Sequence, residues 1–361
     1  MSDFIVEVCE VAEVKPHPNA DRLDVIRVKG WEVITQRGTY KVGDRVTYFP
    51  PDTIMPKDFI TDHGIEKYVK TARDAEGIMR PCRIAACKLR GIPSFGFVIP
   101  AKLDAQVGDN MISCYGATKY EPPSTAQVRG GEAMRCPPNF LKYDGPERWQ
   151  EYGDALVEGE DVVISEKIHG RNCRAALIHT GEGVYEFQGG SHNGCQKEFY
   201  DEGSARSCYW AGINDDTKAL LSAVSAGRND VILYGEVYGA RMQDMTYGEN
   251  REQKFRAFDL CINGKYVNYP DFVSLCQKYN VPMVPILYVG PYSREKVLEL
   301  TDGPTTLCTP DQISSGFKGR EGVVVKPTTE RTFLKRGGPN RLILKSVSAD
   351  YLARRGGTEE H

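Results

Sequence analysis

The stretch Val162-Val163-Ile164-Ser165-Glu166-Lys167-Ile168-His169-Gly170-Arg171-Asn172 places a lysine where an apolar run ends. The run is typical of a buried strand, and Gly170 allows the chain to turn sharply after it. A lone ammonium group is costly to bury, so a lysine beside a core needs a reason. Two interpretations of Lys167 stay open on this stretch alone: a surface lysine that follows a strand, and a nucleophile.

The composition is that of an ordinary globular chain of 361 residues, with 40% hydrophobic and 26% charged residues, enough for about two or three domains. A formal net charge of −3 excludes a generally basic nucleic-acid coat, so any nucleic-acid contact must come from local patches. No apolar run approaches the roughly 20 residues of a membrane span, and no signal peptide is evident, so no membrane partner is expected. The eleven cysteines contain no Cys-x-x-Cys pair, which favours a reducing cytoplasm over zinc or disulfides.

Residues 1–121 predict an all-β domain, a small closed barrel of the OB type. Short strand-like runs alternate with turns rich in Gly, Pro and Asn, as small barrels require. The clearest runs are 4–14, 23–28, 45–49, 83–89 and 96–99. The segment from Val14 to Leu23 resembles the opening of tRNA-binding OB domains, such as those in phenylalanyl-tRNA synthetase.

Basic residues gather between Lys67 and Arg90, with aromatic residues among and after them. Such a mixture can follow a phosphate backbone and stack bases, although a solvated charged face is the alternative. We select Arg83, Lys88 and Arg90 as the candidates for nucleic-acid binding.

Residues 122–139 are rich in Pro, Gly, Ser and Thr and predict a linker. Residues 140–361 predict an α+β domain with antiparallel sheets and helices packed outside them. The expected strands are 161–165, 231–237, 256–262, 322–326 and 341–345, and the expected helices are 217–226, 270–279 and 293–300.

Four later stretches also place charged residues at or near strand ends: Glu236, then Asp259 beside Phe258, then Glu321 with Lys326, and finally Lys345. Val324 and Lys326 must share one face of their strand, because side chains alternate. Glu321 has the opposite parity, so it joins the same site only if the strand begins after it.

Together these groups suit nucleotidyl transfer. A lysine nucleophile must lose its proton near neutral pH, and cations such as Lys326 and Lys345 favour that loss. The same cations can neutralise a phosphate in the transition state. Glu236 can hold ribose hydroxyls, and Glu321 and Asp259 can hold a hydrated Mg²⁺ ion.

The order of these residues resembles the covalent nucleotidyltransferase superfamily of ATP-dependent ligases and mRNA capping enzymes. DNA ligases and capping enzymes usually carry Asp where His169 stands, and a histidine there resembles the RNA ligases of phages and of kinetoplastid RNA editing. An OB-like barrel in front of the ligase domain further resembles the Deinococcus-type RNA ligases.

The resemblance implies an ATP-grasp-like adenylation domain in which Lys167 becomes linked to AMP, with Lys326 and Lys345 also catalytic. It implies that Glu321 binds Mg²⁺ or Mn²⁺, with Asp259 as the second candidate for the metal. The candidates for contacts with RNA are Arg83, Lys88, Arg90 and His192. The residues implied for ATP or AMP are Glu166, Lys167, Ile168, Asn172, Glu236, Phe258, Val324, Lys326 and Lys345.

Two positions depart from the family pattern. The last motif usually reads Lys-x-Lys, but Ile343 stands at the first lysine position, and Arg341 is the candidate to replace that phosphate contact. Many relatives have Ser-Arg where this chain has Ser191-His192-Asn193, which makes His192 the candidate for the RNA 5′-phosphate.

The expected function is ATP-dependent joining of RNA 3′-OH and 5′-phosphate ends through lysyl-AMP and adenylylated RNA. The expected partner is RNA in the form of a nicked duplex, and the expected state is a monomer. Two alternatives stay open: a DNA ligase or capping-type nucleotidyltransferase, and a non-catalytic RNA-binding protein with a decayed ligase fold.

Overall fold

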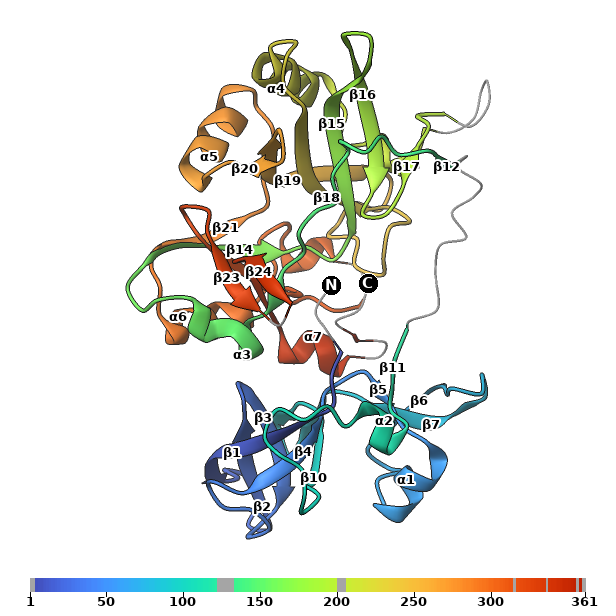
Figure 1. Ribbon diagram of the computed structural model, residues 1–361, viewed down its shortest axis with the longest axis vertical. Helices are drawn as coiled ribbons and strands as arrows, with labels where there is room; N and C mark the ends of the chain where they lie inside the picture. The colour runs from blue at the N-terminus through green and yellow to red at the C-terminus, as the bar shows by residue number, and fades with distance from the viewer. Residues whose placement is uncertain are drawn as a thin grey trace. The chain divides into compact units, whose positions relative to one another are not determined.

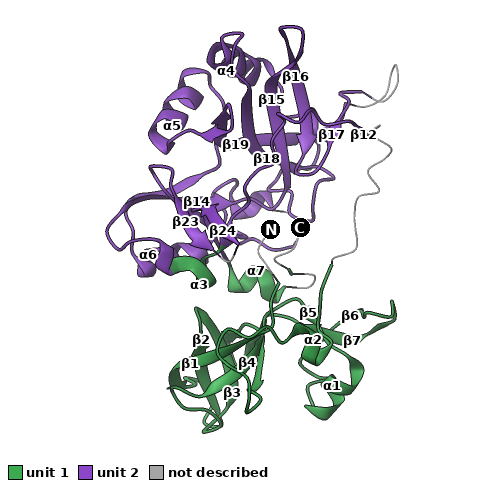
Figure 2. Ribbon diagram, viewed as in Figure 1, with its two compact units in different colours: residues 1–123, 148–153, 347–361 green, residues 124–147, 154–346 purple. Residues whose placement is uncertain are grey.

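The computed structural model describes residues 4–121, 133–199, 206–313, 316–335, 337–354 and 357–358. The chain forms two compact units, coloured separately in Figure 2. Unit 1 comprises residues 1–123, 148–153 and 347–361, and unit 2 comprises residues 124–147 and 154–346. The units therefore do not follow the chain as the predicted domains do. Most of the predicted linker, from 122 to 132, lies outside the described residues.

Unit 1 is built on a five-stranded antiparallel sheet in the order β10-β4-β1-β2-β3 (Figure 1). The long first strand pairs with β4 through its first half and with β2 through its second, so the sheet coils around a core that contains Val11, Ile26 and Trp31. Among the described residues no strand pairing closes the sheet from β3 to β10, but the Phe95 N–H donates to the Glu32 carbonyl on that side. The strands are β1 (Glu7–Pro16), β2 (Leu23–Val28), β3 (Trp31–Gln36), β4 (Arg45–Phe49) and β10 (Phe97–Pro100).

A second sheet of unit 1 has the order β11-β5-β7-β6, and a separate hairpin pairs β8 with β9. The strands are β5 (Thr53–Ile54), β6 (Lys70–Arg73), β7 (Met79–Ile84), β8 (Cys87–Leu89), β9 (Ile92–Ser94) and β11 (Thr118–Lys119). The helices of this unit are α1 (Lys57–Asp62), α2 (Ile112–Tyr115), α3 (Trp149–Tyr152) and α7 (Ala349–Ala353). Two of these helices come from segments that lie far along the chain from the barrel.

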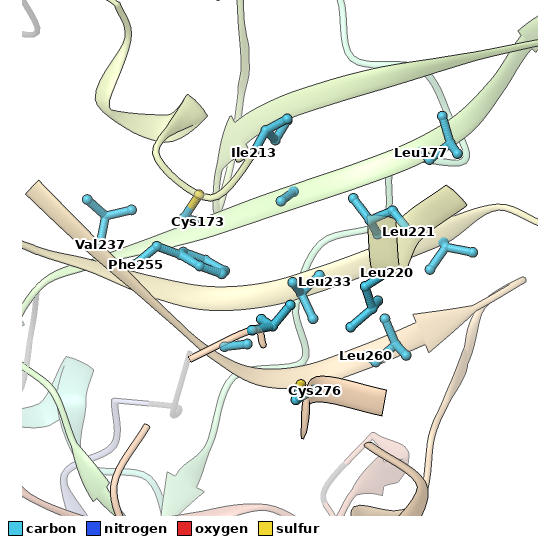
Figure 3. Packing of buried hydrophobic residues seen from close by; sticks show 14 of the residues in the cluster. Cys173, Leu177, Ile213, Leu220, Leu221, Leu233, Val237, Phe255, Leu260 and Cys276 are labelled. Atoms are coloured by element: carbon cyan, nitrogen blue, oxygen red, sulfur yellow. The ribbon is translucent and has the colours of Figure 1, made fainter. Parts of the chain in front are cut away.

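Unit 2 contains a seven-stranded antiparallel sheet in the order β12-β17-β16-β15-β18-β19-β20. Helices α4 (Asp215–Ser225) and α5 (Tyr269–Lys278) pack on one face of it. Leu220 and Leu221 of α4 and Cys276 of α5 contact Leu233 and Leu260 of the sheet (Figure 3). The strands are β12 (Ala133–Met134), β15 (Arg171–Gly181), β16 (Val184–Ser191), β17 (Cys195–Gln196), β18 (Val231–Gly239), β19 (Gln253–Ile262) and β20 (Lys265–Tyr266).

Unit 2 also contains a five-stranded sheet in the order β13-β25-β22-β14-β21, whose strands come from segments before and after the large sheet in the chain, and β23 and β24 form a separate hairpin. Helix α6 (Arg294–Thr301) packs near β22. The strands are β13 (Glu147–Arg148), β14 (Asp161–Lys167), β21 (Ile286–Pro291), β22 (Gly322–Pro327), β23 (Thr332–Lys335), β24 (Gly338–Arg341) and β25 (Leu344–Val347).

The predicted fold class, an OB-type domain followed by an α+β domain with antiparallel sheets, is confirmed. The prediction of one strand over 341–345 is wrong, because β24 ends at Arg341 and β25 begins at Leu344. Within the described part of the chain, no helix has the length and apolar character needed to cross a bilayer.

Candidate active site

The turn that follows β14 connects the two sheets of unit 2. Lys167 is the last residue of β14, and β15 begins only four residues later at Arg171. Gly170 lies so close to β18 that a Cβ atom would be 2.3 Å from the Val237 carbonyl oxygen and 2.9 Å from the Glu236 Cγ atom. The glycine is therefore required by a close approach of two chain segments, which brings Lys167 beside the end of β18.

The Lys167 Nζ atom donates to the Glu321 Oε1 atom. The Glu321 side chain is fully buried, whereas the Lys167 side chain remains 22% exposed. The pairing of β14 with β22 sets Lys167 opposite Gly322, so Glu321 lies just before the strand begins. Glu321 can therefore reach the same site as Lys326 despite its opposite parity, because it precedes β22 and does not follow the alternation of that strand.

Val324 and Lys326 share a face of the sheet with Lys167, as predicted. Val324 is opposite Ser165 and Lys326 is opposite Val163, and both partners have the parity of Lys167. Four residues of strand separate the two lysine positions, which corresponds to roughly 13 Å along the backbone. The two lysines therefore lie at separate positions along one sheet face, and each ammonium group pairs with a carboxylate, Lys167 with Glu321 and Lys326 with Asp259.

Glu236 lies in β18 opposite Asn172 of β15, on one face of the large sheet. Burial raises the pKa of Glu236 to about 8, with Lys167 opposing the rise and Glu321 adding to it. Asn172 has a buried Oδ1 atom that accepts no hydrogen bond from the described residues. These two side chains can thus offer a protonatable carboxyl group and an amide to a ligand's hydroxyls.

Phe258 owes its position to a β-bulge in β19. Tyr234 pairs with Asp259 and Gly235 pairs with Ala257, so Phe258 is the extra residue. Such a bulge re-aims a side chain. Phe258 and Val324 both pack, half-buried, against the apolar cluster around Tyr143, whose ring centroid lies 4.8 Å from that of Phe258. The two residues proposed to enclose a base are therefore brought together.

Asp259 holds a buried ionic network rather than an open ligand position. Its two oxygens accept from the Arg341 guanidinium at 3.0 Å each, from Lys326, and from the Tyr143 hydroxyl at 2.6 Å. Burial alone would raise the pKa of Asp259, but Arg341 and Lys326 outweigh it and lower the pKa to about 2. The prediction that Asp259 binds metal is corrected, because its oxygens are already engaged by protein donors.

Arg341 is likewise engaged and lies flat on an aromatic ring. It donates to Glu330 at 2.6 and 2.7 Å, and its Cζ atom is 3.6 Å from the Tyr266 ring centroid. Ile343 is buried in the apolar cluster that also contains Tyr143. Arg341 therefore stabilises Asp259. Because its guanidinium group is occupied in this way, it does not take over the phosphate contact that a lysine at position 343 would make.

Lys345 is buried in β25, the strand that neighbours β22 in the sheet. It thus stays a candidate for phosphate binding on the same sheet as Lys326, and its role is a proposal.

Glu166 does not face the candidate nucleotide site. Its buried carboxylate accepts from the Thr305 hydroxyl at 2.5 Å, the Thr306 hydroxyl at 2.6 Å and the Thr306 N–H at 2.8 Å. Alternation along β14 sends this side chain to the face opposite Lys167. The prediction that the Glu166 side chain binds the nucleotide is therefore corrected, because its carboxylate anchors residues 305–306. Ile168 is buried in the turn after β14.

His169 is held by a loop that sequence reasoning missed. Its backbone N–H donates to the Tyr247 hydroxyl at 2.7 Å, and its Nε2 atom is 2.7 Å from the Asp244 Oδ1 atom. The Gln243 side-chain amide donates to the Gly170 carbonyl at 3.4 Å. Residues 240–252, between β18 and β19, thus fix residues 168–170, which we call the nucleophile turn because Lys167 is the proposed nucleophile. No local sequence signal predicts these contacts.

His192 lies in the loop after β16, where it is half-buried. Burial lowers the pKa of His192, and the cationic Arg174 and Lys142 add to the effect. Arg174 is buried and donates to the carbonyl oxygens of Ser191 and Phe140 at 2.6 Å each, which fixes the base of this loop. A role of His192 in RNA binding remains a prediction.

The three RNA candidates of unit 1 have different surroundings. Arg83 is buried, pairs with Asp52 and donates to the Gly357 carbonyl at 2.6 Å, so its prediction as an RNA contact is corrected. Lys88 pairs with Asp350 at the surface. Arg90 is exposed at the tip of the β8–β9 hairpin with a positive φ of 49°.

The donor set around Lys167 fits a hydrated magnesium ion better than an all-protein metal cage. Within the described residues no group of three or more His, Cys, Asp or Glu side chains could hold a metal. Glu321 and Glu236 are near each other and near Lys167. Mg²⁺ usually takes one or two carboxylates and completes its shell with water and substrate phosphates. Glu321 is therefore the residue that would hold such an ion, which would neutralise phosphate charge.

A family model described as RNA ligase matches residues 160–347, which is more than half of the chain. This chain belongs to the RNA ligase family. A second model, that of an OB-fold domain, matches residues 5–101. The family recognition made from the motifs is thus confirmed, and the matched range begins just before β14 and ends with β25.

Solved structures of an RNA ligase from Naegleria gruberi are similar to this ligase over nearly its whole length. A variant with ATP and Mn is 23% identical with a TM-score of 0.76, covering 98% of this chain and 100% of that chain. A variant with AMP and Mn is 22% identical with a TM-score of 0.74, covering 98% and 99%. The enzyme with PPi is 23% identical with a TM-score of 0.74, covering 97% and 98%.

At these identities the likeness shows the fold, an OB-fold domain followed by an α+β ligase domain. A comparison with curated proteins finds no match.

Proposed function

We propose that this chain is an ATP-dependent RNA ligase that joins RNA 3′-OH and 5′-phosphate ends. The Lys167 Nζ atom attacks the α-phosphorus of ATP, forming a P–N bond and releasing pyrophosphate. The AMP then passes to the 5′-phosphate of RNA, which frees the lysine. The 3′-OH attacks the activated phosphate, forming the phosphodiester bond and releasing AMP.

The observation that supports this proposal best is the surroundings of Lys167. A partly exposed lysine ends a strand, with the buried Glu321 carboxylate on its ammonium group and Glu236 nearby. Val324 lies on the sheet face that carries Lys167, and it packs with Phe258 against one apolar cluster, where a flat base fits; Lys326 lies farther along the same face. Positioning and charge neutralisation supply most of the catalysis of phosphoryl transfer, so this arrangement suits the reaction.

ATP and a divalent ion, Mg²⁺ or Mn²⁺, are the proposed cofactors. This choice is supported by the Naegleria structures, which share the fold of this chain and contain ATP and Mn or AMP and Mn. Glu321 is the proposed metal residue. Lys167, Asn172, Glu236, Phe258, Val324, Lys326 and Lys345 are the proposed nucleotide residues.

The first prediction concerns the covalent intermediate. Incubation of the full chain with α-labelled ATP and magnesium should give acid-stable label on the wild type and none on Lys167→Ala, because no other group takes the place of the nucleophile. Lys296→Ala is the matched control, since Lys296 is a partly exposed lysine of α6 that pairs with Glu299. Label that persists in Lys167→Ala would refute the mechanism.

GTP competition in the same assay, followed by a comparison of RNA and DNA ends, distinguishes an RNA ligase from a capping-type enzyme or a DNA ligase. Adduct formation with GTP in preference to ATP would favour the capping-type alternative. The absence of any adduct in the wild type would favour the non-catalytic RNA-binding alternative.

The proposed substrate is a nicked RNA duplex, and the proposed state is a monomer. Sealing rates on a nicked duplex and on open single-stranded ends would test the substrate, and sedimentation would test the state. The proposed location is a reducing cytoplasm, which is supported by the eleven cysteines, all free thiols.

A further inference from the structure

A basic pocket of about 760 Å³ lies in unit 2 on the loop that holds the nucleophile turn. Arg206, Arg241, Asn250 and Arg251 are among its lining residues. It opens where β18 ends and β19 begins, and the Ala240 N–H donates to the Glu252 carbonyl at 2.9 Å to close the loop. None of the residues assigned to the nucleotide lines this pocket.

The charges of the pocket are not neutralised from within. Arg241 and Arg251 are exposed, and neither makes a side-chain hydrogen bond or ion pair with any residue that the structure describes. The one acidic lining residue, Glu252, pairs with Lys254 at 2.9 Å. Arg206 is engaged with Glu198 and the Ile213 carbonyl and forms a fixed wall. Two free guanidinium groups therefore face an open space, where an anion would be attracted.

The backbone of the loop is strained at the position of one of these arginines. Arg241 has a φ of +62°, and Tyr247 in the same loop has a φ of +53°. A side chain rarely occupies this region, where glycine is favoured, and such strain concentrates at functional sites. Arg241 therefore has a backbone conformation that a glycine would adopt at lower cost.

Other residues of the same loop contact the nucleophile turn. Asp244 and Tyr247 bind His169, and Gln243 donates to the Gly170 carbonyl. A polyanion in the pocket would thus be held by the element that fixes Lys167. An RNA backbone fits this arrangement, because exposed arginines suit a chain of phosphates that passes over the surface.

We propose that Arg241 and Arg251 bind internal phosphates of the RNA strand and so align it with the nucleophile turn. This inference rests on the proposed function, because it assigns the RNA-binding surface of the same site.

The test compares Arg241→Gly with Arg251→Ala, combined in one full-length chain, with a control of equal charge change, Arg228→Ala with Lys265→Ala. The glycine relieves the positive φ, so the double variant should fold. Arg228 and Lys265 are exposed at the end of the sheet where β18 begins, opposite to the pocket. Fluorescence anisotropy with labelled RNA over a range of salt concentrations gives the Kd and its salt dependence.

The pocket variant should raise the RNA Kd at least about 10-fold, and the slope of log K against log salt should fall by about 1.4, since each lost contact to single-stranded phosphate removes about 0.7. The same loss is expected for RNA with a 5′-OH end. Lysyl-AMP formation should keep its wild-type dependence on ATP concentration. A Kd equal to that of the control would overturn the inference.

Two other outcomes would also contradict it. A rise in the ATP concentration needed for half-maximal lysyl-AMP formation would assign the arginines to the triphosphate. A loss confined to 5′-phosphorylated RNA would assign them to the strand end. The anisotropy measurement needs no catalysis, whereas failure of the wild type to form lysyl-AMP would count against the proposed function alone.

Discussion

At the scale of single residues, Glu236 has the clearest perturbed chemistry. Its pKa of about 8 means that the carboxyl group is largely protonated near neutral pH in the protein without nucleotide. A neutral carboxyl group can both donate and accept a hydrogen bond, which suits a pair of ribose hydroxyls. Burial is the main cause, and the neighbouring Glu321 adds to it, so the shift belongs to the site as a whole.

The pH dependence of stability follows from this shift. Between about 4.5 and 8 the folded protein keeps a proton that the unfolded chain releases, so the free energy of unfolding falls as pH rises through this window. Glu236→Gln stays uncharged, and its unfolding free energy should fall less from about pH 5 to about pH 8 in urea titrations. Glu186→Gln, at an exposed position of β16, is the control. Parallel profiles for wild type and Glu236→Gln would contradict the raised pKa.

At the scale of elements, the bulge in β19 and the break between β24 and β25 together set the positions of Phe258 and Arg341. The bulge brings Phe258 to the face of β19 that carries Asp259, and the break releases Arg341 from the strand that holds Lys345. Arg341 then pairs with Asp259 and Glu330. The ionic network of Asp259, Arg341 and Lys326 thus connects β19, β24 and β22.

Arg341→Met should lower the free energy of unfolding by about 3–5 kcal/mol, since removing one partner of a buried pair leaves an uncompensated charge. Combining it with Asp259→Asn should restore part of the loss, because the remaining charge is then removed. Arg294→Met is the control, and it should cost about 0–1 kcal/mol because Asp154, its partner, is exposed. A stable Arg341→Met protein that needs more ATP for lysyl-AMP formation would instead favour the phosphate role.

At the scale of the whole molecule, unit 1 is assembled from three separate segments of the chain. The described residues of the last segment, 347–354 and 357–358, make polar contacts with β6, β7 and Asp52 of the same unit. Arg83 donates to the Gly357 carbonyl, Lys70 donates to the Leu352 carbonyl at 3.4 Å, and the Thr358 hydroxyl donates to Asp52 at 2.6 Å. The basic cluster predicted to bind nucleic acid thus partly serves to hold the end of the described chain.

Arg83→Met should therefore destabilise unit 1 by about 3–5 kcal/mol, since Asp52 would stay buried without its guanidinium partner. Lys88→Met removes a pair to the same segment at the surface and should cost only about 0–1 kcal/mol. Thermal unfolding of both variants measures the difference. If both variants lose little stability and Arg83→Met binds RNA more weakly, the result would favour the original prediction that Arg83 contacts RNA.

The sequence by itself determined the family and the fold class, and it selected Lys167 as the proposed nucleophile. Most strands, such as 231–237 and 322–326, and all three predicted helices have their counterparts, because apolar periodicity and turn residues are local signals. Strand alternation alone placed Val324 and Lys326 on one face, and the register confirms it. The order of charged residues at strand ends selected Lys167 and Glu321 as candidates, and the structure pairs their side chains.

Only the tertiary structure decided which charged groups are available to a ligand. Asp259, Glu166 and Arg83 carry the expected chemistry, but each is satisfied by a partner that lies far away in sequence, namely Arg341, Thr305 with Thr306, and Asp52. The loop 240–252 likewise acquires its role from contacts with His169. Burial and pairing with distant residues set the free-energy cost of each charged group. No local pattern in the sequence reveals either of them.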